Sequence, residues 1–206
     1  MEAAHDRCNA WWSAPIPRDA VPKERHARRN VERDRCRALV GLVTPGDNAP
    51  VSRTHSHGQA GVAVGPTGSR VGIDLEREID RDFLSLSELA FSPAEHEWLR
   101  DLPPGERRLS FYSLWTLKEA FAKALGLDLC TALASCRFAP TTVGFAAVVP
   151  TTAHWSAEVF SPFEGYRMAV VSLAPAGATR AAPIVIAGIP GVGCQSVRET
   201  LRAVRC

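Results

Sequence analysis

The chain has 206 residues, of which 46% are hydrophobic and 22% are charged, and its formal net charge is +2. These values are those of an ordinary globular protein with one domain or two small ones. So small a net charge gives no support to nucleic-acid binding, and no apolar run is long enough to span a bilayer. Because the N-terminus lacks the basic start and apolar core of a signal peptide, we expect a cytoplasmic protein. The six cysteines form no Cys-x-x-Cys pair, so we expect free thiols at Cys8, Cys36, Cys130, Cys136, Cys194 and Cys206.

The first part of the chain divides into an irregular segment and a basic helix. Residues 1–22 are expected to be irregular, because Pro15, Pro17 and Pro22 resist regular helix. Residues 23–42 are helix-permissive and carry seven Lys or Arg side chains interrupted by three acids. Two interpretations stay open: a solvated helix whose charges pair with one another, or an anion-binding face for a phosphorylated ligand. Residues 44–50 have the composition of a turn.

Residues 51–76 predict a β-hairpin closed by a Pro-Thr-Gly-Ser turn. In the returning strand, apolar residues alternate with polar ones, so Asp74 and Glu76 should emerge side by side on the polar face. The opposite strand carries Ser56 and His57 within a His-Ser-His-Gly cluster. A structural and a functional role for this histidine are both open.

Two helical segments come next. Residues 77–100 are amphipathic, and Ser92-Pro-Ala-Glu95 has the form of a capping box, which gives Glu95 a structural explanation. A Leu-Pro-Pro-Gly turn at residues 102–105 is the expected boundary between two half-domains. Residues 106–126 predict a long helix that ends at a glycine.

The remainder of the chain predicts strands and then a tail. From Cys136 onward the pattern is β, with four expected strands at residues 137–140, 143–149, 154–160 and 166–173. After Pro175 the composition changes to Ala, Gly and Pro, and we expect an appended, partly flexible tail. Its residues 188–196 resemble a phosphate-binding loop only superficially, because they lack the Lys-Ser/Thr pair that such a loop requires.

Acidic side chains on two of these elements can converge. Glu119 and Lys123 are four residues apart and share one face of the long helix. If that face meets the strand that carries Asp74 and Glu76, three carboxylates and one lysine come together. Three carboxylates with room for phosphate and water are what a Mg²⁺ site needs.

These residues resemble a known family. The segments VGIDLE (residues 71–76) and WTLKEAFAK (residues 115–123) look like the signature of the 4'-phosphopantetheinyl transferases, closest to the monomeric type that primes peptide and polyketide synthases. Ser56-His57-Gly58 lies where that family has an upstream Ser-His motif, and GYRMAV at residues 165–170 resembles its closing strand. The resemblance covers about residues 50–175.

The resemblance implies an activity and roles for these residues. The family moves the phosphopantetheine arm of coenzyme A (CoA) onto a serine of an acyl or peptidyl carrier protein and releases 3',5'-ADP. By resemblance, Asp74, Glu76 and Glu119 would hold Mg²⁺ against the CoA pyrophosphate. Glu119 and Lys123 would be catalytic, with Glu119, Glu95 or a metal-bound water as the base. Ser56, His57 and Lys123 would bind CoA, with His57 on its 3'-phosphate.

The resemblance also implies a fold and a domain division. The family fold is α+β, with two similar halves, each a small antiparallel sheet packed on a long helix, and the active site in the cleft between them. We expect an N-terminal half over residues 1–104 that contains the hairpin, a C-terminal half over residues 105–175 and a tail over residues 176–206. The Gly-Lys-Pro segment that usually precedes the Ser-His motif is absent, and the first half is short.

The sequence is compatible with three functions. The leading hypothesis is a monomeric, Mg²⁺-dependent enzyme that acts on CoA and a carrier protein, with fatty-acid, polyketide and peptide synthesis all left open. The missing Gly-Lys-Pro segment motivates an alternative, a degenerate module that binds CoA or a carrier protein without turnover. A nucleic-acid-binding protein is the weakest hypothesis, because the basic run has no interleaved aromatic residues.

Overall fold

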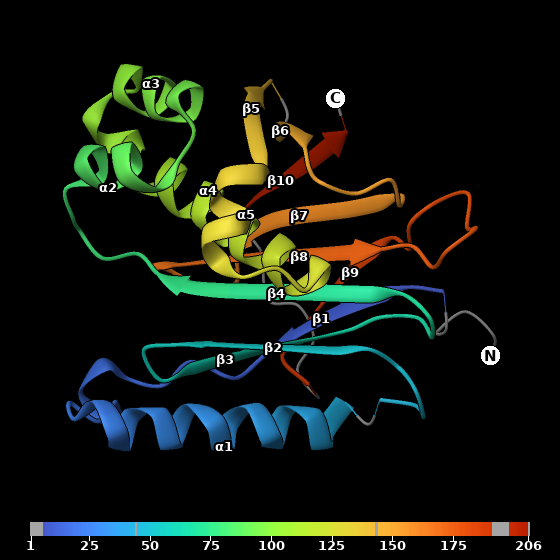
Figure 1. Cartoon of the computed structure of the whole chain (residues 1–206). Helices are drawn as coiled ribbons and strands as arrows, with labels where there is room; N and C mark the ends of the chain where they lie inside the picture. Colours follow the sequence, from blue (N-terminus) through green and yellow to red (C-terminus); the bar gives the residue numbers. More distant parts are fainter. Residues whose placement is uncertain (1–5, 44, 143, 191–197, 206) are drawn as a thin grey trace.

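The computed structural model describes residues 6–43, 45–142, 144–190 and 198–205, the last range for its backbone alone. Two sheets lie in layers, and each is covered by one long helix (Figure 1). The expected α+β class and its two sheet-and-helix layers are therefore confirmed. Among the described residues, no helix is long and apolar enough to cross a membrane.

The first sheet has four strands in the spatial order β2, β3, β1 and β9. Their bounds are β1 (Cys8–Trp12), β2 (Val51–Ser56), β3 (Gln59–Val64) and β9 (Ile184–Gly188). Helix α1 (Arg25–Val43) covers this sheet and buries Cys36 and Leu39 against Ala60 and Val62 of β3. The predicted basic helix is confirmed, whereas the segment expected to be irregular contributes β1 and the short 3-10 helix η1 (Arg18–Ala20).

The second sheet has six strands in the spatial order β4, β8, β7, β10, β6 and β5. Their bounds are β4 (Arg70–Arg77), β5 (Arg137–Thr141), β6 (Gly144–Val148), β7 (Trp155–Ser161), β8 (Tyr166–Leu173) and β10 (Arg198–Arg205). Helix α4 (Pro104–Leu125) covers β4 and β8. The approach is closest at Gly72, where an added Cβ would lie 1.9 Å from the carbonyl oxygen of Ala120.

Three shorter helices surround α4: α2 (Phe83–Ala90), α3 (Pro93–Asp101) and α5 (Leu129–Ser135). The predicted capping box is confirmed, because the Ser92 side chain accepts from the Glu95 backbone and Glu95 reaches back to the Ser92 N–H. The predicted glycine stop of α4 is confirmed at Gly126, whose left-handed φ of 70° ends the helix. Helix α5 was not predicted, although Asp128 caps it through the Thr131 N–H.

Two predictions about strand pairing are wrong. Strand β4 does not form a hairpin with the preceding strand, because it pairs antiparallel with β8 in the second sheet, while the true hairpin joins β2 to β3. The segment expected to be an appended tail supplies β9, parallel to β1, and β10, which lies between β6 and β7. Strand β10 runs parallel to β6 and antiparallel to β7. All the other strand pairs of the two sheets are antiparallel.

The chain first changes from one sheet to the other between β3 and β4, returns to the first sheet at β9 and enters the second again at β10. The division into halves at residue 104 stays a prediction. The four cysteines within the described residues are free thiols. Cys194, Cys206 and most of the rejected loop at residues 188–196 lie outside the described residues.

Candidate functional site

Four of the predicted site residues meet where β4 packs against α4. Asp74 is 3% exposed, and the Nζ of Lys123 donates to its Oδ1 at 2.8 Å. The same ammonium group donates to the carbonyl oxygen of Ile73 at 2.8 Å. Glu76 follows two residues further along the strand, and Glu119 lies one helical turn before Lys123. The predicted meeting of the strand and helix is therefore confirmed.

The carboxyl groups influence one another's ionisation. Burial, and after it the charges of Asp74 and Glu119, raise the pKa of Glu76 to about 8. Burial and the adjacent Asp74 carboxylate raise the pKa of Glu119 as well. Like charges at short range disfavour full ionisation, and a bound proton or cation relieves the repulsion. The cluster formed by Asp74, Glu76 and Glu119, called the acidic cluster below, therefore favours a cation.

The residues present fit a divalent cation by their chemistry. The Oδ2 atom of Asp74 is buried and receives no hydrogen bond from any described N–H or hydroxyl group. Carboxylate oxygens are the ligands that Mg²⁺ prefers. Within the described ranges, however, no three Asp, Glu, His or Cys side chains are already arranged as a metal cage. Binding would therefore require the carboxylates to turn toward the ion.

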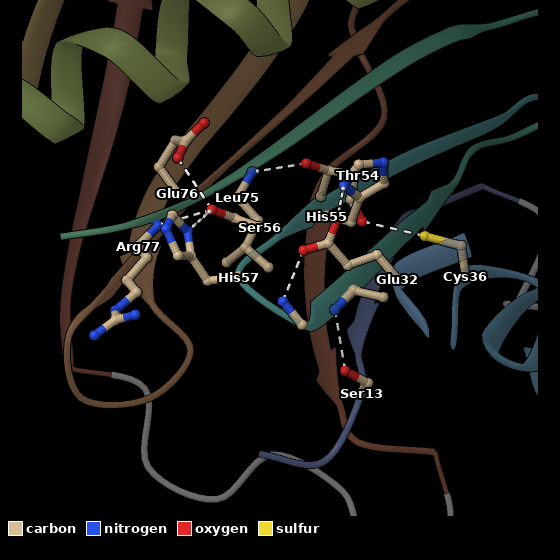
Figure 2. Close-up of polar contacts among 12 residues, drawn as sticks. Ser13, Glu32, Cys36, Thr54, His55, Ser56, His57, Leu75, Glu76 and Arg77 are labelled. Carbon is tan, nitrogen blue, oxygen red and sulfur yellow. Dashed lines mark hydrogen bonds and ion pairs between the residues drawn. The ribbon is translucent and has the colours of Figure 1, made fainter. Parts of the chain in front are cut away.

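His57 lies at the tip of the β2–β3 hairpin, one residue beyond Ser56. His57 and Gly58 form its two-residue loop, with φ values of 47° and 84°, as a type I′ turn requires. The Oε1 atom of Glu32 accepts from the Gly58 N–H at 2.8 Å, and the Tyr166 hydroxyl donates to the carbonyl oxygen of His57 at 3.2 Å. The peptide group between His57 and Gly58 is thus held through its N–H by Glu32, which Figure 2 shows beside the hairpin tip, and through its carbonyl oxygen by Tyr166.

The surroundings of His57 are basic. Burial lowers the pKa of His57, and the charges of Arg77, Arg28 and Arg81 lower it further. These three guanidinium groups come from α1 and from the end of β4 and its following loop. A histidine among arginines offers hydrogen bonds and positive potential to an anion. Two interpretations of the basic helix were left open above. The position of Arg28 near His57 supports an anion-binding face, whereas the exposed pair of Arg37 with Asp34 is what a solvated helix with internal ion pairs would show.

Ser56 joins the hairpin tip to the acidic cluster. Its hydroxyl donates to the Oε2 of Glu76 at 3.1 Å, accepts from the Arg77 N–H at 3.2 Å and lies 3.1 Å from the Nδ1 of His57 (Figure 2). The predicted Ser56 and His57 are therefore adjacent to Glu76, across the boundary between the two sheets. In this structure the Ser56 hydroxyl is engaged by Glu76 and the β4 backbone.

Glu95 lies away from the acidic cluster. It is 1% exposed, its Oε2 lies 3.0 Å from the Nζ of Lys118, and its Oε1 accepts from the Phe138 N–H at 2.8 Å. Lys118 is itself fully buried and also donates to the carbonyl oxygens of Leu133 and Cys136. Glu95 therefore ties α3 to α4 and β5, and its candidacy as the base is wrong.

Sequence reasoning missed two residues that shape the site. Thr54 donates to the Oδ1 of Asp74 at 3.2 Å, and Glu32 holds both Gly58 and, at 3.0 Å, the Nδ1 of His55. The regular Ser52-x-Thr54-x-Ser56 spacing was a readable signal for the first. Glu32 had no comparable signal, because it looks like one of the acids that interrupt the basic helix.

Comparison with known proteins gives matches around the acidic cluster. The family model described as the 4'-phosphopantetheinyl transferase superfamily matches residues 70–171. The 4'-phosphopantetheinyl transferase HetI of Nostoc is 42% identical over 74 residues, which are 35% of this chain and 31% of that protein. The 4'-phosphopantetheinyl transferase gsp of Aneurinibacillus migulanus is 35% identical over 71 residues, 34% of this chain and 30% of that protein.

A longer and more distant match is the 4'-phosphopantetheinyl transferase pptA of Paxillus involutus, 27% identical over 148 residues, 60% of this chain and 54% of that protein. The chain thus spans between about a third and a half of these relatives. The solved holo-[acyl-carrier-protein] synthase of Thermotoga maritima aligns with a TM-score of 0.40 and 22% identity over 52% of this chain and 63% of its own, a likeness too low to support any argument.

The family match runs from the first residue of β4 to Val171, the sixth of the eight residues of β8, and includes every member of the acidic cluster. The chain belongs, through residues 70–171, to the 4'-phosphopantetheinyl transferase superfamily.

Proposed function

We propose that this chain transfers the 4'-phosphopantetheine arm of CoA to a serine of an acyl or peptidyl carrier protein, with 3',5'-ADP as the second product. The convergence of three carboxylates and Lys123 between β4 and α4 is the observation that carries this proposal. The family membership of the segment that contains them supports it.

Asp74, Glu76 and Glu119 would hold Mg²⁺ in the proposed enzyme. The ion would neutralise charge on the CoA pyrophosphate and so stabilise the charge that develops during transfer. The unpartnered Oδ2 of Asp74 and the raised pKa of Glu76 support this assignment. Lys123 contributes a fixed positive charge at the same place and keeps Asp74 in position.

The transfer step itself needs a proton acceptor. The serine oxygen of the carrier forms a bond to the phosphorus that bears the pantetheine, the bond from that phosphorus to the bridging pyrophosphate oxygen breaks, and 3',5'-ADP leaves. We assign the serine proton to Glu119, the cluster carboxylate that lies beside Asp74 and one helical turn from Lys123. Lys123 would then face the departing phosphate charge.

The hairpin tip supplies the second part of the proposed CoA site. His57, with Arg28, Arg77 and Arg81 around it, forms a basic environment suited to the 3'-phosphate. Glu32 and Tyr166 fix the loop that carries the imidazole, so the phosphate would meet a preorganised group. Ser56 lies between this basic environment and Glu76.

Intact-mass spectrometry of an apo carrier protein tests the proposal. The carrier is incubated with the chain, CoA and Mg²⁺, and a parallel sample contains EDTA. We expect a metal-dependent gain of one phosphopantetheine. Asp74→Asn should reduce the rate about 100-fold or more, because it removes one charged ligand while keeping an acceptor for Thr54.

The exposed Asp80, which follows β4, provides the matched control, since Asp80→Asn makes the same change outside the cluster. No gain in mass across several carriers, together with retained CoA binding in calorimetry, would support the alternative of a binding module without turnover.

A further inference from the structure

Strand β4 is the edge strand of its sheet, and side chains rather than a second strand satisfy its outer edge. The N–H groups of Ile73, Leu75 and Arg77 donate to side-chain hydroxyls of β2 at 3.2, 3.0 and 3.2 Å. The accepting hydroxyls belong, in the same order, to Ser52, Thr54 and Ser56. The three alternate along β2 and are all buried, so they form a hydroxyl row that joins the two sheets.

Two members of the hydroxyl row have a second partner in the acidic cluster. Thr54 donates to the Oδ1 of Asp74 at 3.2 Å, and Ser56 donates to the Oε2 of Glu76 at 3.1 Å (Figure 2 shows the Ser56 bond). The described bonds of Ser52 include none to a carboxylate. The row therefore contains two residues that touch the cluster and one that only supports the strand.

The chemistry of a hydroxyl makes these bonds directional. A hydroxyl has one proton and two lone pairs. Since a backbone N–H of β4 occupies a lone pair of Thr54, its proton is free to point at Asp74. Lys123 donates to the same Oδ1, which leaves Oδ2 of Asp74 as the oxygen without a described donor. Thr54 and Lys123 together thus determine which carboxylate oxygen is available to a ligand.

We propose that Thr54 is a positioning residue for the cation site, which orients Asp74 so that its Oδ2 faces the metal ion. This inference rests on the proposed function, because it takes Asp74 as a metal ligand. Ser56 acts on Glu76 in the same way, so its hydroxyl serves the acidic cluster. Groups that orient a metal ligand typically change metal affinity about 10-fold to 100-fold when removed.

The experiment measures Mn²⁺ binding by electron paramagnetic resonance in the full chain, with Mn²⁺ as a paramagnetic substitute for Mg²⁺. Thr54→Val keeps the shape of the side chain and removes its hydroxyl. Ser52→Ala is the matched control, because it also deprives one β4 N–H of its acceptor but touches no carboxylate. Thr54→Ser restores the hydroxyl.

We expect Thr54→Val to raise the dissociation constant for Mn²⁺ about 10-fold to 100-fold. Ser52→Ala should stay within about twofold of wild type, and Thr54→Ser should recover most of the lost affinity. The melting temperature of each variant measures how much stability is lost when a β4 N–H loses its hydroxyl acceptor, independently of metal binding.

Two results would overturn the role of Thr54. One is wild-type Mn²⁺ affinity in folded Thr54→Val, and the other is an equal loss of affinity in Ser52→Ala. Either result leaves the proposed transfer reaction intact if wild type still modifies the carrier. A wild-type chain that neither binds Mn²⁺ nor modifies a carrier would instead overturn both.

Discussion

At the scale of single residues, ionisation of the acidic cluster costs free energy in the folded protein. Three carboxylates share a largely buried space with the ammonium group of Lys123. Burial and mutual repulsion both oppose full ionisation. Without a cation, the cluster therefore lowers the stability of the folded protein at a pH where all three groups must ionise.

This arrangement predicts how stability depends on pH in the metal-free protein. The pKa of Glu76 is about 8 in the folded state against 4.5 ordinarily. Between these values the folded state keeps a proton that the unfolded state has lost, so the free energy of unfolding falls as pH rises from about 5 to 8. Melting temperatures in EDTA should accordingly decrease over that range.

Mg²⁺ should counter this decrease, and its stabilising effect should be larger at pH 8 than at pH 5, where protons compete for the carboxylates. Thermal melts with and without Mg²⁺, in buffers of the same ionic strength and free of Ca²⁺, distinguish binding of Mg²⁺ at the acidic cluster from general charge screening. A Mg²⁺ effect of equal size at both pH values would contradict the prediction.

His57 gives a second residue-scale prediction. His57→Asn removes the imidazole, and asparagine tolerates the left-handed backbone that this position adopts. If the imidazole binds the 3'-phosphate, KM for CoA should rise about 10-fold with little change in kcat, as for the loss of one charged hydrogen bond.

The matched substrate for this test is 3'-dephospho-CoA. Wild type should use it with a raised KM, and His57→Asn should not raise that KM further. An equal rise in KM for CoA and for 3'-dephospho-CoA would contradict a contact between His57 and the 3'-phosphate.

The residues of the acidic cluster could be predicted from sequence, because their positions follow from two periodicities. Asp74 and Glu76 alternate on a strand, and Glu119 and Lys123 are one helical turn apart. Glu32 could not be predicted in the same way, and the alternation of Ser52, Thr54 and Ser56 indicates only that they share one face of a strand, not what that face meets. A buried hydroxyl or a buried carboxylate on an otherwise polar element looks identical in sequence to an exposed one, and only the approach of β2 and α1 to their partners decides which it is.

At the scale of elements, the contact between β4 and α4 determines the geometry of the site. The helix approaches the strand so closely at Gly72 that no side chain fits between them. This approach is what brings Lys123 within hydrogen-bonding distance of both Ile73 and Asp74. A glycine inside a strand often marks such a close approach of backbones.

Gly72→Ala should therefore be strongly destabilising. Its Cβ would lie 1.9 Å from the carbonyl oxygen of Ala120 and 2.8 Å from the N of Ala124, so α4 must move away from β4. Overpacking of a core typically lowers the free energy of unfolding by about 1–3 kcal/mol, and a backbone clash lies at the upper end or beyond. Urea unfolding measures the change.

Gly105→Ala in the first turn of α4 is the control, because nothing lies within 4 Å of its added Cβ. It should be neutral or stabilising by up to about 1 kcal/mol. Equal unfolding midpoints for the two variants would show that the helix adapts without loss.

The sequence predicts where these helices and strands occur better than it predicts which strands pair with one another. The capping box at Ser92 determines the start of α3 and Gly126 the end of α4, and these two boundaries were predicted correctly. The pairing of β4 was not, because a turn at residues 66–69 indicates a reversal of direction without specifying which strand follows alongside. Here β4 pairs with β8, a strand that begins only at Tyr166, and the hydrogen bonds that its backbone makes to β2 all go to side-chain hydroxyls.

At the scale of the whole molecule, the segment after Pro175 belongs to both sheets. Strand β9 extends the first sheet beside β1, and β10 fills the gap between β7 and β6 in the second. Composition predicted a tail because Ala, Gly and Pro are common there, but parallel pairing depends on distant strands that the local sequence does not indicate.

Removal of residues 198–206 should divide the second sheet into β4-β8-β7 and β6-β5. We expect a lower and broader thermal transition by circular dichroism, because both new edges lose their backbone partners. Removal of residues 176–206 should reduce stability further, since β1 then loses β9 as well. A sharp transition at the wild-type temperature in the shorter variant would mean that β10 contributes little.

The placement of β10 also affects how the protein is made. The strands on either side of it, β6 and β7, are synthesised earlier and remain adjacent to an unfilled position until residues 198–205 leave the ribosome. Unpaired edges of this kind are the surfaces on which chains aggregate and to which chaperones bind. The six-stranded second sheet therefore closes only after synthesis has passed residue 205, and the yield of the protein in a cell should depend on how long the nascent chain is protected until then.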